Sequence, residues 1–223
     1  MTAPVPPPYP PPPPPAYAAR LEVDYTPDRN RLTAFFRLFT VIPIAIVYGV
    51  LTAGGSTTTV YANGAREVTQ TSGGIVAGLF LATLLMILFR QRYPRWWFDF
   101  ALELNRFGTR VGAYTVLLTD EYPSTVEEQR VHLDLDYPEV ERDLNRWLPL
   151  VKWFLAIPHY IVLFFLGIGA FFVVIFAWFA ILFTGRFPPG LFDYVVGVGR
   201  WAMRVNAYAF LLLTDRYPPF SLD

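Results

Sequence analysis

Residues 147–183 read WLPLVKWFLAIPHYIVLFFLGIGAFFVVIFAWFAILF, and Lys152 is the only charged side chain among them. As one helix this apolar run would measure about 55 Å at 1.5 Å per residue, whereas the hydrocarbon core of a bilayer is about 30 Å thick. The run must therefore fold back on itself. Gly167 and Gly169 have the greatest backbone freedom in it, so the sequence predicts that the chain folds back there, between membrane spans near 147–166 and 169–185.

The composition of the whole chain also indicates a membrane protein. Of its 223 residues, 54% are hydrophobic and only 16% are charged, against about 25% charged residues in soluble proteins. The formal net charge is zero, which excludes a nucleic-acid-binding protein of basic character. The chain has no cysteine and only two histidines, so we expect no disulfide, no metal site and no cofactor.

The two halves of the chain share a long series of matched residues. Asn30-Arg31, Arg37 and Ile42-Pro43 return 115 positions later as Asn145-Arg146, Lys152 and Ile157-Pro158. Later blocks return at an offset of 94 or 95, and they are Phe98-Asp99, Arg106, Arg110-Val111, Ala113-Tyr114 and Leu-Leu-Thr119-Asp-x-Tyr-Pro123. The kept order and spacing predict two tandem copies of one unit. The shorter offset places about 21 extra residues in the first copy, at 52–73.

The matches divide the chain into three parts. Residues 1–19 hold ten prolines between Pro4 and Pro15, and they predict either a disordered spacer or a docking peptide for an aromatic groove. Residues 20–124 form the first copy, with spans near 31–51 and 74–90, and residues 125–223 form the second. All 18 Lys and Arg residues except Arg66 lie outside the connections between paired spans, so the positive-inside rule predicts that both termini are cytoplasmic.

Each pair of spans is followed by a segment that is apolar but too charged to cross a bilayer. In the first copy, one stripe of a helix near 95–118 carries Asp99, Glu103, Arg106 and Arg110, and a similar segment lies near 189–213. We expect two amphipathic helices in the cytoplasmic interface. Alternating patterns at 20–25 and 131–137 predict short cytoplasmic strands, which a two-fold axis between the copies would make antiparallel neighbours.

The predicted fold class is therefore all-α membrane. It has four transmembrane helices in two tandem hairpins and two interfacial helices. The alternating segments at 20–25 and 131–137 can add short cytoplasmic strands.

Six basic side chains are candidate contacts for an anionic lipid or ligand. Arg37 and Lys152 occupy equivalent places a turn or two inside their spans, where a charge costs about 3 kcal/mol. The other four lie on the interfacial helices and are Arg106, Arg110, Arg200 and Arg204. The alternative for Arg37 and Lys152 is that their long side chains reach the interface and anchor the helices.

His159, Pro158 and Pro43 are the candidate residues of a pathway through the membrane. A histidine in a membrane helix can relay protons. However, His159 stands where the first copy has Ile44 and has no acidic partner in the spans, so packing is the alternative role. The two prolines predict helix kinks, which either line a cavity or match the shapes of the two halves.

No catalytic signature is present in the sequence. There is no Walker loop, no His-Glu-x-x-His and no Gly-x-Ser-x-Gly, so we expect neither catalytic residues nor an enzyme. The leading hypothesis is a scaffold or binding module for anionic membrane lipid, for a membrane-protein partner or for a second copy of the chain. The alternative is a small transporter or channel with its pathway between the two copies.

The repeated Phe-Asp, Arg-Val-x-Ala-Tyr and Leu-Leu-Thr-Asp-x-Tyr-Pro blocks, with Ile157-Pro158-His159 in an aromatic span, resemble a known family. It is a family of bacterial, mainly actinobacterial, membrane proteins built on a domain of unknown function. The resemblance covers about residues 20–223. It implies a multi-pass protein of the bacterial plasma membrane with no assigned activity, and it supplies no catalytic residues.

Overall fold

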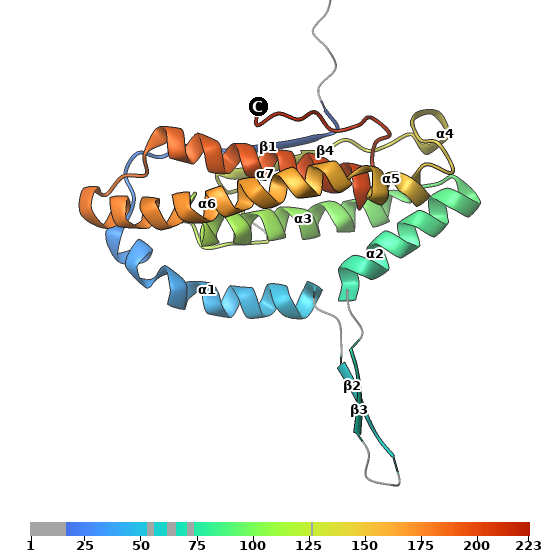
Figure 1. Cartoon of the computed structure of the whole chain (residues 1–223), viewed down its shortest axis with the longest axis horizontal. Helices are drawn as coiled ribbons and strands as arrows, with labels where there is room; N and C mark the ends of the chain where they lie inside the picture. The colour runs from blue at the N-terminus through green and yellow to red at the C-terminus, as the bar shows by residue number, and fades with distance from the viewer. Residues whose placement is uncertain (1–16, 53–55, 62–65, 71–73, 126) are drawn as a thin grey trace, which may run out of the picture.

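The computed structural model describes residues 17–52, 56–61, 66–70, 74–125 and 127–223, and these residues are mostly helical (Figure 1). Residues 1–16 of the predicted proline-rich tail lie outside the described residues. The strands are β1 (Ala19–Val23), β2 (Ser56–Val60), β3 (Arg66–Gln70) and β4 (Val131–Leu135). The helices are α1 (Arg31–Thr52), α2 (Gly74–Leu85), the π-helix η1 (Met86–Arg90), α3 (Arg95–Thr115), α4 (Val140–Asp143), α5 (Pro149–Leu155), α6 (Ile157–Thr184) and α7 (Pro189–Ala209).

The predicted short strands are present and pair with each other. β1 and β4 form an antiparallel two-stranded ribbon in which Leu21 lies opposite Leu133. The alternating apolar residues of both strands are buried, because α7 packs against β1 and α3 packs against β4. The ribbon therefore joins the two halves of the chain on one side of the molecule (Figure 1).

The predicted fold-back at Gly167 and Gly169 is wrong. α6 runs without a break from Ile157 to Thr184, and the apolar stretch is interrupted earlier, at Ala156 between α5 and α6. Glycine lowers helix stability by about 1 kcal/mol but does not forbid a helix. At Gly169 the missing side chain has a packing role instead, because a β-carbon there would lie 2.6 Å from the hydroxyl of Tyr194.

Two membrane-spanning helices, rather than four, have support in the described part of the chain. α1 and α6 are long and apolar enough to cross a membrane, whereas the apolar segment Gly74–Arg90 is shorter. The predicted span near 147–166 does not form, because its first part becomes the seven-residue helix α5. Most large side chains on α1 and α6 are exposed, including Leu38, Phe39, Phe172 and Phe176.

The predicted helices near 95–118 and 189–213 are present as α3 and α7, and each ends a few residues earlier than predicted. Leu117 and Leu212 then adopt left-handed conformations, with φ of 67° and 57°. α7 is not a peripheral helix, because it lies between β1 and α6 and buries residues along its whole length. The polar stripe of α3 and the apolar body of both helices follow the predicted periodicity.

The predicted insertion at 52–73 contains the antiparallel hairpin of β2 and β3. Figure 1 shows this hairpin projecting away from the body beyond α1 and α2, on the side opposite the β1–β4 ribbon.

Candidate functional site

Arg37 of α1 is buried in a cluster of protein acceptors. Its Nη1 donates to the backbone carbonyl groups of Tyr114 (3.0 Å) and Thr119 (2.8 Å), and its Nη2 lies 2.5 Å from Oδ1 of Asp120. The guanidinium also lies 4.0 Å from the centre of the Tyr114 ring, which adds a cation–π contact. The other carboxylate oxygen of Asp120 accepts the N–H of Asn30, just before α1. We call Arg37, Asp120 and Tyr114 the first clamp.

Lys152 of α5 has the same kind of environment. Its Nζ donates to the carbonyl of Thr214 (2.8 Å), lies 2.7 Å from Oδ1 of Asp215, and is 5.3 Å from the centre of the Tyr208 ring. Asp215 also accepts the N–H of Asn145. We call Lys152, Asp215 and Tyr208 the second clamp. The side chains of Arg37 and Lys152 are 4% and 0% exposed, so both charges are committed to protein groups and neither is offered to a lipid headgroup.

Arg106 and Arg200 donate hydrogen bonds to outward-facing carbonyl groups on the two edges of the ribbon. In an antiparallel pair, opposed residues that do not hydrogen-bond to each other turn their N–H and C=O groups outward. Leu21 and Leu133 are such a pair, because Asp24–Arg130 and Asp136–Ala18 carry the flanking hydrogen bonds. Nε of Arg106 donates to Leu133 O (3.0 Å), and Nε of Arg200 donates to Leu21 O (3.1 Å).

Arg110 and Arg204 hold loop backbone in the same way. Nη1 of Arg110 donates to Ser124 O (2.6 Å), and Nη2 of Arg204 donates to Ser221 O (3.2 Å) and to Asp223 O. Burial, together with the neighbouring charge of Arg200, lowers the pKa of Arg204. The four arginines predicted on the interfacial helices thus each donate to backbone carbonyl groups: Arg106 and Arg200 on the ribbon, Arg110 in the loop before β4, and Arg204 in the C-terminal segment.

His159 is fully buried in an aromatic cluster. Trp201 Nε1 donates to His159 Nδ1 (3.1 Å), and the imidazole stacks on Phe220 with ring centres 4.0 Å apart. Because the indole N–H can only donate, Nδ1 is the acceptor and the imidazole carries its proton on Nε2. Nε2 has no hydrogen-bond partner among the described residues. This arrangement fits the packing alternative better than a proton relay.

The two predicted pathway prolines lie on the outer surface. Pro43 is inside α1 and Pro158 is in the first turn of α6, and both are exposed. Neither lines the two clefts described next.

A central cleft of about 490 Å³ separates α3 from α7 beneath the ribbon. Small residues such as Gly108, Gly112 and Gly199 line it, so its walls are largely apolar. Its polar part is a hydrogen bond across the gap, from Nδ2 of Asn206 to Oδ1 of Asn105 (2.9 Å). The sequence analysis did not select these two asparagines, because they are not equivalent positions of the two halves.

A second cleft, of about 690 Å³, lies where η1 turns into α3, opposite the segment before and within α4. We call it the corner cleft. One wall carries Arg90, Arg92 and Arg95, and the other carries Glu139, Glu141 and Arg142. Burial raises the pKa of Tyr93, on its floor, to about 12, so the hydroxyl stays protonated and donates to Leu211 O.

The arginines of the corner cleft were missed in the sequence analysis, although a signal for them exists. Arg-x-Arg-x-x-Arg directly follows an apolar run, so these cations stand where that run ends. Basic side chains at such positions meet phosphate groups when the apolar segment is in a bilayer.

The described residues contain no group of three or more His, Asp or Glu side chains placed to hold a metal ion.

Comparison with known proteins gives one family match, and it carries no activity. A domain of unknown function (DUF4389) matches residues 147–221, which run from just before α5 to the C-terminal segment. The match thus includes the second clamp, His159 and Arg200, the arginine of α7 that contacts the ribbon. Neither the curated proteins nor the solved structures contain a match to the chain. Over residues 147–221 the chain is therefore similar to a family whose function is unknown.

Proposed function

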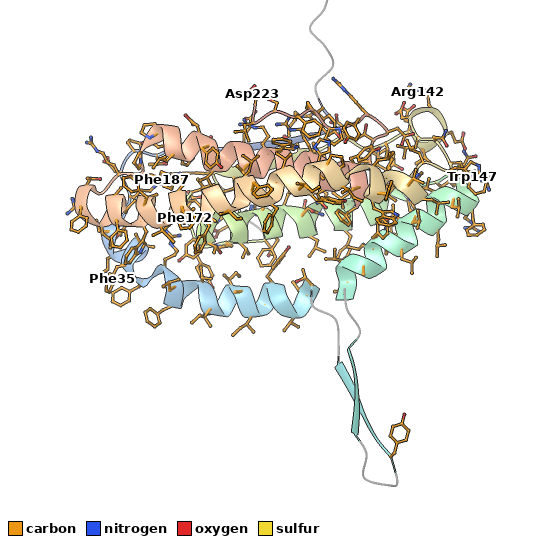
Figure 2. The ribbon with its side chains drawn as sticks, in the orientation of Figure 1. Phe35, Arg142, Trp147, Phe172, Phe187 and Asp223 are labelled. Atoms are coloured by element: carbon orange, nitrogen blue, oxygen red, sulfur yellow. The ribbon has the colours of Figure 1, made fainter. Side chains whose placement is uncertain are left out.

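We propose that this protein is a non-enzymatic membrane module that holds anionic lipid at the boundary of a bacterial plasma membrane. The observation that carries the proposal is the separation of two surfaces. Exposed phenylalanine and aliphatic side chains cover α1 and α6, while the charged groups gather around the ribbon. Figure 2 shows Phe35 on the α1 side and Arg142 and Asp223 on the ribbon side. An exposed apolar surface of this extent indicates a lipid or protein partner.

The proposal includes two tandem copies of one unit. Positions 94 or 95 apart share unusual backbone: Gln91 and Gly185 both have positive φ at the ends of apolar helices, as do Leu117 and Leu212 after α3 and α7. Equivalent contacts also cross between the halves, since Tyr25 donates to Phe187 O and Tyr137 donates to Tyr93 O. The two clamps add a third matched set. These similarities support duplication more strongly than the sequence matches alone.

The proposed orientation follows from the same asymmetry of charge. The ribbon side carries both ends of the described chain and the ion pairs of Arg20, Arg106 and Arg130 (Figure 1), so we place it in the cytoplasm under the positive-inside rule. The β2–β3 hairpin, which contains Arg66, projects from the side of the body opposite the ribbon (Figure 1).

The test is to identify the lipids that remain bound to protein purified in mild detergent from its own membrane, by mass spectrometry. We expect anionic phospholipids to exceed their share in the bulk membrane, whereas an unrelated polytopic protein from the same membrane should not enrich them. Retained lipids in bulk proportion would overturn the proposal. Replacing Arg106, Arg110, Arg200 or Arg204 is not a useful test, because each donates to backbone and its loss would disturb the fold.

A small transporter or channel is the second candidate, and the central cleft between α3 and α7 favours it. This cleft lies between the two halves, where a pathway was predicted, and has the Asn105–Asn206 pair as its polar element. Solute flux into proteoliposomes that is lost in the Asn206→Leu variant would support this candidate. Absence of flux for a panel of ions and small solutes would remove it.

A further inference from the structure

We propose that the corner cleft binds the phosphate of an anionic phospholipid through Arg90, Arg92 and Arg95. The inference rests on the proposed lipid-binding function and gives it a site. Four arginines line the cleft. Arg95 and Arg142 pair with the carboxylates of Asp99, Glu139 and Asp143, whereas Arg90 and Arg92 carry two positive charges that no described carboxylate pairs with. A site with excess positive charge favours a lipid with net negative charge over a zwitterionic one.

Two of these arginines are uncommitted. Arg90 and Arg92 are exposed and have no ion pair or hydrogen bond with any described residue. Arg95 lies 4.8 Å over the Tyr137 ring and 3.6 Å from Asp99, on a surface where 70% of its side chain is exposed. Ion pairs this exposed contribute little, so Arg95 can turn toward a stronger partner. On the opposite wall, Arg142 is occupied by Glu139 and Asp143.

The equivalent corner between α6 and α7 shows that the turn does not need these cations. Gly185 there has the same left-handed conformation as Gln91, but Thr184 and Pro189 stand in place of Arg90 and Arg95. The remaining arginine, Arg186, already faces Asp28 at 3.9 Å. The same backbone is therefore built without a cation at two of these three positions, so the left-handed turn itself does not require Arg90 or Arg95.

The cleft also lies at the right depth for a phosphate. It begins at Met86, at the end of the apolar segment Gly74–Arg90, and the exposed Trp96 directly follows its lining residue Arg95. Aromatic side chains of this kind mark the level of lipid headgroups. Figure 2 shows Trp147 and Arg142 at the end of the molecule that α2 reaches. Arginine suits a phosphate at this level because its planar fork can give two parallel charge-assisted hydrogen bonds.

The experiment titrates the full chain, in detergent, with short-chain phosphatidylglycerol, phosphatidylcholine and phosphatidylethanolamine and follows tryptophan fluorescence, which Trp96 beside the cleft should report. We expect the wild-type chain to prefer phosphatidylglycerol and the Arg90→Gln/Arg92→Gln variant to bind it at least about tenfold more weakly. The matched control is Arg186→Gln at the equivalent corner, which should leave the affinity unchanged. Both variants alter exposed side chains, so an unchanged thermal midpoint will show that they fold.

The outcomes separate the site from the function. If the double variant keeps the wild-type preference, the corner cleft is not the site although the proposed function stands. If the wild-type chain itself shows no preference, or binds phosphatidylethanolamine equally well, the proposed function fails with it. Displacement of phosphatidylglycerol by millimolar inorganic phosphate would assign the cleft to a free phosphate compound and overturn the lipid as its ligand.

Discussion

At the scale of single residues, the cations inside the apolar helices are structural. A buried charge is costly unless it is paired and hydrogen-bonded, and Arg37 and Lys152 meet both conditions. Each binds a carboxylate and at least one carbonyl group from the segment that follows α3 or α7. Leu117 and Leu212, which have positive φ, lie two residues before Thr119 and Thr214, whose carbonyl groups accept hydrogen bonds from these cations. The clamps therefore fix how the chain leaves these two helices.

Breaking the second clamp should expose this role. In Lys152→Met, Asp215 keeps its charge without its partner, and we expect a loss of about 3 kcal/mol in the free energy of unfolding. Adding Asp215→Asn removes the unpaired charge and should restore about half of that loss. Chemical unfolding in mixed micelles would measure both. A double variant as unstable as the single one would show that the loss does not come from the unpaired carboxylate of Asp215.

At the scale of elements, the spacing of apolar residues along the chain predicted helices and strands better than the overall apolar composition did. α3, α7 and the two strands of the ribbon could be predicted because their apolar residues repeat with helical or strand spacing. α6 has apolar residues all round and therefore no usable period, so its bounds had to be inferred from length and from glycine. Length predicted a fold-back within 147–183, and this was wrong, because the only break in the described helix is the single residue Ala156, which keeps a right-handed helical conformation. Length could not show this break either, because Ala156 is an ordinary helix former.

The contacts within the clamps could not be predicted from the sequence, for a different reason. Asp120 and Asp215 are distant in sequence from Arg37 and Lys152, and nothing local shows which carboxylate each cation will meet. The corner cleft depends on the same kind of long-range approach, since its two walls come from 86–95 and 137–142. Only the matched spacing of the halves suggested that both cations share one role.

Two glycine variants test the continuity of α6. Gly169→Ala places a β-carbon 2.6 Å from Oη of Tyr194 and disturbs the hydrogen bond of that hydroxyl to Leu166 O, so stability should fall by about 1–3 kcal/mol. Gly167→Ala meets nothing within 4 Å and should stabilise the helix by up to about 1 kcal/mol. Thermal unfolding in detergent distinguishes them. A large loss in Gly167→Ala would instead indicate a turn at this place.

At the scale of the whole molecule, the separated apolar and charged surfaces determine where the protein can reside. Phe172 and Phe176 are 63% and 62% exposed on α6. A carboxylate in hydrocarbon costs about 3 kcal/mol, so Phe172→Asp with Phe176→Asp should shift the chain from the membrane pellet toward the soluble or aggregated fraction. Arg142→Gln, which also removes positive charge but on the ribbon side, should not. Equal membrane retention of both variants would place α6 outside the bilayer.

The β1–β4 ribbon makes each half of the chain depend on the other. If the two halves are copies of one unit, as proposed above, a polypeptide with one copy would have a lone strand, and its counterpart of Tyr25 or Tyr137 would lack its carbonyl acceptor. Two separate units would have to find each other by diffusion, and their association would weaken on dilution. When both units are part of one polypeptide, they associate within the same molecule, at a high effective concentration. The fused chain can therefore reach the same assembly even when only a few molecules are present in a cell.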